Sequence, residues 1–443
     1  MAESAEDFSE ALLNFSGKIS LNWVKEKGGN PESTKEYQEL FKLFPELRDL
    51  FQNGAQNDPQ EFSRTVVHIF HALAVYQRVN SCSFPESGLD DSHISELLEL
   101  SNSISSVNPS IMPLILWLHD IGKFEGHGDH TEQSARIIRK GNLLQGKGLS
   151  EEEALVITKV IQYHLLIGTL YSGEISYLSF GLLLEDEDFH PILGDGALSE
   201  LFIHSLILFT MIDIWAYPYN TKAVSASMIK DYLRIGEELK SVLIKGLSLD
   251  GALENLEEKA KEGTDWRLFC FMGAFTRMHS KPHLSPRFYR DKVIRGAGEF
   301  RGADLSPDDW NEFKSKNLSR FHVMQFKYAL ATICSLAFGS TSVFKSDWGP
   351  EHKFNPKIFD LLVFLNKRIL LEERKRRTSK NTIWNIVFTG APNYFRKTDL
   401  IERLNDPGAI KALIEKGETG VIQEGKIHCL TLDLKPYWKY LKE

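Results

Sequence analysis

Cysteine is scarce in this chain of 443 residues. The four cysteines, Cys82, Cys270, Cys334 and Cys429, are scattered, and no two have CxxC spacing. This excludes the paired-cysteine motifs of structural zinc sites and of thiol redox enzymes. Reduced, structural thiols are typical of a cytoplasmic protein, and that is the location we expect.

Positive charge is not in excess either. The chain has 52 Lys and Arg against 60 Asp and Glu, which gives a formal net charge of -8. We therefore expect no general nucleic-acid binding and no attraction to anionic membranes. The one basic cluster, LLEERKRRTSK at Leu370 to Lys380, places Glu372 and Glu373 four residues before Arg376 and Arg377. That spacing favours a solvated helix face over a nucleic-acid or partner patch.

The sequence also lacks long apolar runs and a signal-peptide pattern. The N-terminal residues MAESAEDFSEALLNF are acidic, unlike the basic-then-apolar order of a signal peptide. No apolar run reaches the length needed to span a bilayer. The longest candidate, from Leu201 to Tyr217, is interrupted by His204 and Asp213, which favours a buried helix. We expect a soluble protein with no membrane partner.

Helical periodicity of apolar residues dominates the first two-thirds of the chain, where strand patterns are scarce. Ser150 precedes three glutamates, so we expect a capped helix from there to about Tyr163. A second long helix is expected from Ser199 to Ala216. The pattern predicts a mainly all-α fold with a helical region at 1–58, a helical domain at 59–250 and a further helical region of unassigned role at 251–380.

The last segment, 381–443, has a different pattern. Thr382 to Phe388 is β-branched and aromatic, and GVIQEGKIHCLTLDL predicts a hairpin that turns at Glu424-Gly425. Two short helical patches lie between them. We expect a small α+β module, with a winged-helix-like arrangement as one candidate.

Histidine and aspartate gather in the helical domain. His119 and Asp120 are adjacent, after the apolar run IMPLILWL, and His130, His164 and Asp213 follow. A lone buried carboxylate costs several kcal/mol, on the order of the penalty for an uncompensated charge, unless a cation or hydrogen bonds offset it. A metal would do so, and nitrogen and oxygen ligands suit Mn, Fe, Mg or Zn. The alternative is a hydrogen-bonded buried network without metal.

The stretches HDIGKFEGHGDHTE, HLLIG and TMIDIWA resemble the HD superfamily of metal-dependent phosphohydrolases. Within it they are most similar to the HD domain of bifunctional uridylyltransferase/uridylyl-removing enzymes, over roughly Pro59 to Leu239. The resemblance implies an HD-domain helical bundle with one or two divalent metal ions (Mn, Fe, Mg or Zn). It also implies hydrolysis of a phosphate ester by metal-activated water, with a phosphomonoester, phosphodiester, nucleotide or nucleotidyl-protein as substrate.

The same resemblance implies the roles of individual residues. Leu73 and Val75 suit a first ligand at His71 better than one at His68. His130 and His164 match the histidines that hold a second ion, bridged to the first through Asp120. Lys123 matches a lysine that meets substrate phosphate, so Asp120 and Lys123 are the expected catalytic residues. The implied metal ligands are His71, His119, Asp120, His130, His164 and Asp213.

Some features depart from the uridylyl-removing enzymes. Their nucleotidyltransferase and sensing domains have no counterpart here, LYSGEISY replaces an arginine-rich stretch, and Tyr163 replaces a frequent histidine. Two alternatives to hydrolysis therefore stay open. One is a di-iron HD-type oxygenase, and the other is a regulatory or ligand-sensing protein with a structural HD core. His127, between two glycines, is a further candidate as general acid or as a loop residue.

Overall fold

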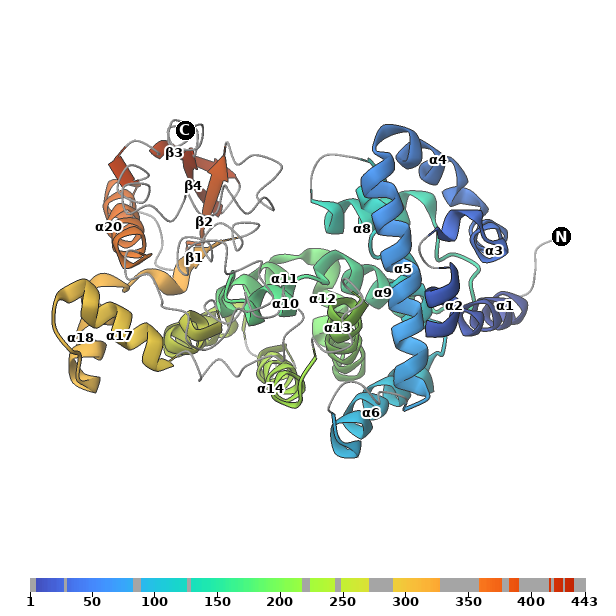
Figure 1. The fold of residues 1–443 in the computed structure, drawn as a ribbon, viewed down its shortest axis with the longest axis horizontal. Coiled ribbons are helices and arrows are strands. Elements are labelled where there is room, and N and C mark those ends of the chain that lie inside the picture. Colours follow the sequence, from blue (N-terminus) through green and yellow to red (C-terminus); the bar gives the residue numbers. More distant parts are fainter. Residues whose placement is uncertain are drawn as a thin grey trace. The chain divides into compact units, whose positions relative to one another are not determined.

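The protein is mainly helical, with one small sheet, in a computed structural model (Figure 1). This confirms the mainly all-α fold with a small α+β part. The structure describes residues 5–27, 30–82, 89–125, 129–216, 224–243, 248–270, 290–326, 358–376, 382–389, 414–415, 418–424 and 427–433.

The chain divides into two compact units. The first comprises Met1–Gly168 and Leu183–Ser248, and the second comprises Thr169–Leu182 and Leu249–Glu443. The division falls within α10 (Leu166–Tyr171) and again within α11 (Gly181–Glu185).

The first unit is entirely helical in its described residues. Its helices are α1 (Ala5–Lys18), α2 (Leu21–Lys27), η1 (Pro31–Ser33), α3 (Lys35–Leu43), η2 (Pro45–Leu47), α4 (Arg48–Asn57), α5 (Pro59–Asn80), α6 (Asp91–Val107), α7 (Ile111–Leu118), η3 (Ile121–Glu125), α8 (His130–Gly141), α9 (Glu151–Tyr163), η5 (Glu187–Phe189), α12 (His190–Gly194), α13 (Gly196–Ala216) and α14 (Ala226–Leu243). α13 packs against α5, α6, α9 and α14, and α8 packs against α9 (Figure 1).

Capping side chains start the helices that build the site. The Asp58 carboxylate accepts a hydrogen bond from the Glu61 amide at the start of α5, where Pro59 occupies the first turn. Ser150 and Glu153 form a capping box at the start of α9, as the sequence predicts. α13 begins at Gly196, three residues before its expected start, and ends at Ala216 as expected.

α13 is apolar along nearly its whole length. Two stretches, Glu151–Tyr171 and Gly196–Ala216, are long and apolar enough by length and composition to cross a membrane, so our expectation that none reaches that length was wrong. Within the protein, 56% and 67% of the two apolar windows are buried. Core helices of globular proteins show the same combination of length and burial.

The second unit combines helices with a four-stranded sheet. Its elements are η4 (Tyr177–Phe180), α15 (Leu249–Glu262), α17 (Arg290–Arg301), α18 (Pro307–Asn317), η7 (Phe321–Val323), β1 (Met324–Gln325), α20 (Ile358–Arg376), β2 (Trp384–Thr389), β3 (Glu418–Glu424) and β4 (Ile427–Asp433). The strand order is β1-β2-β4-β3, with β1 and β4 parallel to β2 and β3 antiparallel to β4.

The strand at β2 and the hairpin of β3 and β4 were expected from sequence, and Glu424 pairs with Ile427 at the hairpin end. The short strand β1, by contrast, was not expected. The helical patches expected between β2 and β3 lie almost entirely outside the described residues.

Two members of the basic cluster on α20, Lys375 and Arg376, are paired with acid. The buried Glu372 accepts hydrogen bonds from Arg368, Lys375 and Arg376, so the expected Glu372–Arg376 pair is present. Glu373 accepts instead from Arg320, at 2.7 Å, while Arg377 lies outside the described residues.

A buried arginine ties the second unit together. Arg267 donates to the backbone carbonyls of Gly173, Glu174, Phe321 and Met324, at 2.6–3.0 Å. Burial lowers the pKa of its guanidinium to about 9. The guanidinium also lies over the Phe321 ring, 4.5 Å from its centroid. One side chain thus donates to four backbone carbonyls from two separate segments of the unit.

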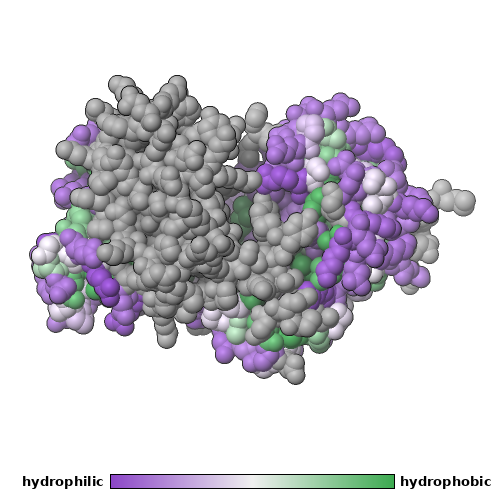
Figure 2. Space-filling model, in the orientation of Figure 1, coloured by the Kyte–Doolittle hydropathy of each residue, from purple (hydrophilic) through white to green (hydrophobic). Residues whose placement is uncertain are grey.

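Large apolar side chains are rarely exposed in the described residues. Those that are exposed, Leu13, Val107, Leu249 and Leu371, come from four different helices. Figure 2 shows a mostly hydrophilic face over the N-terminal helices, with apolar residues between polar ones. Such scattered exposure is ordinary for a folded protein and marks no docking surface.

Candidate metal centre

Histidine and aspartate side chains from five helices of the first unit meet around Asp120. His68 comes from α5, and Asp213 lies near the end of α13. The others occupy helix ends: His119 is the C-cap of α7, His130 begins α8 and His164 is the C-cap of α9. Helix ends and neighbouring helices thus bring together residues up to 145 positions apart.

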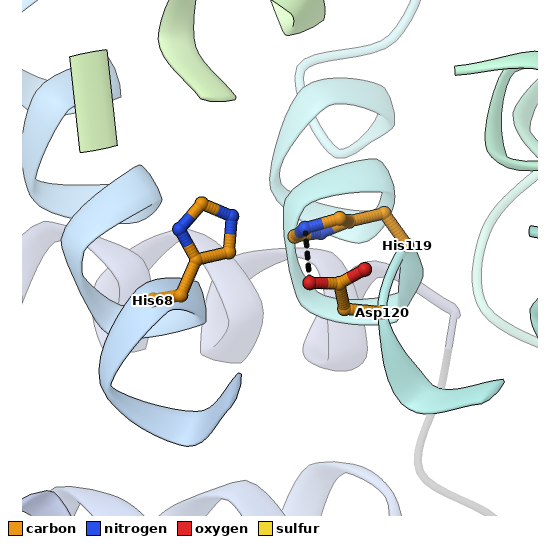
Figure 3. A group of neighbouring side chains, drawn as sticks. All are labelled: His68, His119 and Asp120. Atoms are coloured by element: carbon orange, nitrogen blue, oxygen red, sulfur yellow. Dashed lines mark ion pairs between the residues drawn. The ribbon is translucent and has the colours of Figure 1, made fainter. Parts of the chain in front are cut away.

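The first group consists of His68, His119 and Asp120, whose ligand atoms all lie within 4.8 Å of one another. Figure 3 shows the His68 ring on its helix facing His119 and Asp120. The Nε2 atom of His119 lies 3.3 Å from Oδ2 of Asp120. All three side chains are buried, so the group could hold a metal ion away from bulk solvent.

The second group consists of Asp120, His130 and His164, within the same 4.8 Å limit. Asp120 belongs to both groups. Its Oδ2 faces His119, whereas its Oδ1 lies 3.5 Å from Nε2 of His130. A carboxylate whose two oxygens face different ligand groups has the geometry of a bridging ligand.

The tautomers of two histidines leave a nitrogen lone pair directed at the site. His119 Nδ1 donates to the Leu116 carbonyl at 2.9 Å, and His164 Nδ1 donates to the Ile161 carbonyl at 2.8 Å. A carbonyl can only accept, so each Nδ1 carries a proton, and in its neutral form each ring has its lone pair on Nε2. His119 Nε2 is buried and makes no hydrogen bond in the described part of the chain. Metal-binding histidines are oriented by this kind of hydrogen bond.

Charge at the site also suits a cation. Burial, followed by the neighbouring His119 and His130, lowers the pKa of His164 to about 3 and keeps that imidazole neutral. Burial alone would raise the pKa of Asp120, but His119 and Lys123 outweigh it and hold the pKa well below its usual value. Burial would also lower the pKa of His119, but Asp120 and Asp213 raise it instead, so a bound cation would take the place of the His119 proton between these carboxylates. Neutral imidazole and ionised carboxylate are the forms that bind metals.

Asp213 lies beside the first group but is in neither group. Its Oδ1 accepts a hydrogen bond from His68 Nε2 at 2.7 Å and lies 3.7 Å from His119 Nε2. Burial would raise the pKa of Asp213, but the His68 hydrogen bond outweighs it and lowers the pKa to about 2. In the absence of metal, His68 therefore offsets part of the negative charge of this carboxylate.

His68 lies in the first ligand group, whereas the sequence favoured His71 as the first ligand. His71 is also buried, and burial followed by the charge of His68 lowers its pKa to about 4. It lies in contact with the Ala216 backbone and in neither ligand group. α5 is buried around most of its circumference, so apolar neighbours such as Leu73 could not identify the side that faces the site.

Substituting these two histidines in turn gives a direct test. We expect His68→Ala to weaken metal binding by more than about tenfold, because removing even a residue that only hydrogen-bonds to a metal ligand typically costs about 10–100-fold in affinity. His71→Ala should change the metal affinity much less. Metal affinity and melting temperature of both variants would be measured together. Equal losses, or a larger loss in His71→Ala, would return the assignment to His71.

The HDIGK turn is locked against α8 by close packing. The Gly122 amide donates to Ser134 Oγ at 2.8 Å, and that hydroxyl donates to the His119 carbonyl at 2.7 Å. A Cβ atom at Gly122 would lie 2.3 Å from the His130 carbonyl oxygen, which no real contact allows. Glycine at this position lets the turn that carries Asp120 approach the start of α8 that carries His130.

Lys123 lies at the edge of the same site. Its Nζ forms an ion pair with Asp120 Oδ2 at 2.6 Å, and 23% of the side chain is exposed. Asp213 and His130, at 26% and 19%, are the other partly exposed members. His119 and His164 instead form the floor and pack edge-on against the Phe209 ring. Solvent therefore reaches the site from the side of Lys123, His130 and Asp213.

His127, the further candidate from sequence, lies outside the described residues.

No protein-family model, no curated protein and no solved structure matches the chain.

Proposed function

We propose that this protein is a metal-dependent phosphohydrolase of the HD type. The observation that carries the proposal is Asp120, which both ligand groups share while its two oxygens face different histidines. The fixed tautomers of His119 and His164 support it, because they place lone pairs where a cation would bind.

The donor set fits a hard or borderline metal ion. The groups offer imidazole nitrogen and carboxylate oxygen, and neither includes a cysteine among the described residues. Such a set suits Mn, Fe, Mg or Zn. His68, His119 and Asp120 would hold one ion and Asp120, His130 and His164 a second, with Asp213 beside the first.

A bound divalent ion lowers the pKa of a coordinated water and offsets negative charge on phosphate oxygens. The protein's own side chains would have two further roles, excluding water and binding the phosphate. Phe209 and the buried histidines exclude water from the floor of the site, and Lys123 lies at its open side. An ammonium has three N–H donors, so Lys123 can hold Asp120 and a phosphate oxygen together. A phosphomonoester or phosphodiester is the substrate class that this arrangement suits.

Metal analysis followed by a substrate screen tests the proposal. Protein purified without chelator is expected to hold at least one Mn, Fe, Mg or Zn ion per chain. It should hydrolyse at least one phosphomonoester or phosphodiester, lose that activity on chelation and regain it when metal is restored. Metal-free protein, or metal-loaded protein inactive on every phosphate ester, would contradict it. Iron together with oxygen consumption would identify the oxygenase alternative.

A further inference from the structure

Lys159, on α9, is the buried charge that the proposed reaction does not use. Its side chain is 1% exposed, and its Nζ donates to Asp186 Oδ2 at 2.6 Å and to Gln162 Oε1 at 3.1 Å. Burial of an ammonium is costly and is tolerated where good partners compensate the charge. These two bonds supply the compensation.

Asp186 joins the last turn of α9 to the start of η5. Besides Lys159, its Oδ2 accepts a hydrogen bond from the Tyr163 hydroxyl at 2.6 Å. Its Oδ1 accepts from the Asp188 amide at 3.1 Å and caps η5. One carboxylate thus holds two side chains from the end of α9 and the backbone of the next helix.

Gln162 joins the same turn of α9 to α8. Its Nε2 donates to Glu132 Oε2 at 2.8 Å. Arg139 donates to Gln162 Oε1 and to Glu132 Oε1, both at 3.3 Å. A continuous chain of side-chain bonds therefore runs from Asp186 through Lys159 and Gln162 to Glu132. We call Lys159, Asp186, Tyr163, Gln162, Glu132 and Arg139 the α8–α9 brace.

The brace joins the two helix ends that carry the second ligand group. Glu132 is two residues beyond His130 at the start of α8, and Tyr163 directly precedes His164. The His130 and His164 rings lie 5.4 Å apart between centroids, at 61° to each other. No member of the brace is in either ligand group. Any change in the spacing of these helix ends alters the distance between the two imidazoles.

We infer that Lys159 is a positioning residue that sets the affinity of the second metal ion through the α8–α9 brace. The inference rests on the proposed function only in requiring that Asp120, His130 and His164 bind metal. The other ligands of the first ion would be His68 and His119, on α5 and at the end of α7, and no brace residue belongs to either of these helices. The brace therefore acts selectively on the second ion and decides whether the site holds one ion or two.

A metal titration of the full-length chain tests this inference. Metal-free wild type, Lys159→Met and Tyr163→Phe would be titrated with Mn²⁺ by calorimetry. Lys159→Met should weaken binding of the second ion by about tenfold, the lower end of the loss caused by removing a residue hydrogen-bonded directly to a ligand, because Lys159 acts through the helix ends. Binding of the first ion should change by less than about threefold. Tyr163→Phe removes one hydroxyl and should give a smaller shift in the same direction. Tyr163→Phe tests the inference on its own if Lys159→Met does not fold.

Lys240→Met is the matched control. Lys240 on α14 also makes a lysine–carboxylate bridge to another helix of the first unit, to Glu200 on α13, and neither residue belongs to α8 or α9. It should leave both affinities unchanged. If both ions weaken together in Lys159→Met, or the second ion's affinity does not change in either folded variant, the inference is wrong.

The wild-type titration separates this inference from the proposed function. Two ions with selective loss in the variants but no hydrolysis would support the brace and contradict the phosphohydrolase. Two ions with hydrolysis but no selective loss would contradict the brace alone. A single ion, or none, in wild type would overturn the inference, and none would overturn the proposed function as well.

Discussion

Replacing Asp120 with asparagine is expected to remove metal from both groups at once and to abolish measurable turnover. Asparagine keeps the shape of the side chain but loses the negative charge and one of the two acceptor oxygens. Because Asp120 belongs to both groups, no second carboxylate remains in either of them. Loss of an outer partner costs about 10–100-fold in metal affinity, so we expect loss of this shared ligand to exceed about 100-fold.

The measurement is metal content by elemental analysis, with melting temperature of the metal-free protein as a folding check. Asp250→Asn makes the same chemical change at an exposed side chain in the first turn of α15 and should keep wild-type metal. Retention of one ion per chain in Asp120→Asn would show that the groups are independent, and retention of wild-type content would reject the site.

Lys123→Ala is expected to leave metal content unchanged and to lower kcat/KM by about 10–1000-fold, the range typical for loss of one charge-stabilising donor. Lys123 Nζ lies 2.6 Å from Asp120 Oδ2, and the side chain lies at the open side of the site. An anion bound near Asp120 would therefore be within reach of the ammonium.

Three readouts on this variant separate three roles. A phosphate-binding Lys123 changes kcat/KM alone, a structural one lowers melting temperature or metal content, and a solvated one changes nothing. Lys140→Ala, at an exposed lysine of α8, is the control and should behave like wild type. Unchanged kcat/KM in Lys123→Ala on the best substrate would rule out the phosphate-binding role.

The helices that carry the site could be predicted because their signals are local. The glutamates after Ser150 mark the start of α9, and the apolar run before Ala216 marks α13. The His119–Asp120 pair stood out for a similar reason, since an acid directly after an apolar helix requires compensation. Local patterns of this kind depend only on neighbours in the chain.

The choice between His68 and His71 could not be predicted in the same way. Hydrophobic periodicity identifies the inward face of a helix only when the opposite face is polar, and α5 is buried on most sides. Lys159 and Arg267 were missed for a related reason. Lys159 pairs with Asp186, and Arg267 donates to four distant carbonyls. Tertiary packing brings these partners together, so they leave no local pattern in the sequence.

The position of Asp213 has a consequence for the order of folding. Chains are synthesised from the N-terminus, and α13 follows α5, α7, α8 and α9, against three of which it packs. A nascent chain that ends before Gly196 already contains His68, His119, Asp120, His130 and His164 but lacks the carboxylate that pairs with His68. It also leaves uncovered the apolar surface that α13 later buries. The docking of α13 therefore completes both the core and the charge balance of the site, which cannot form before about half of the 443 residues have been synthesised.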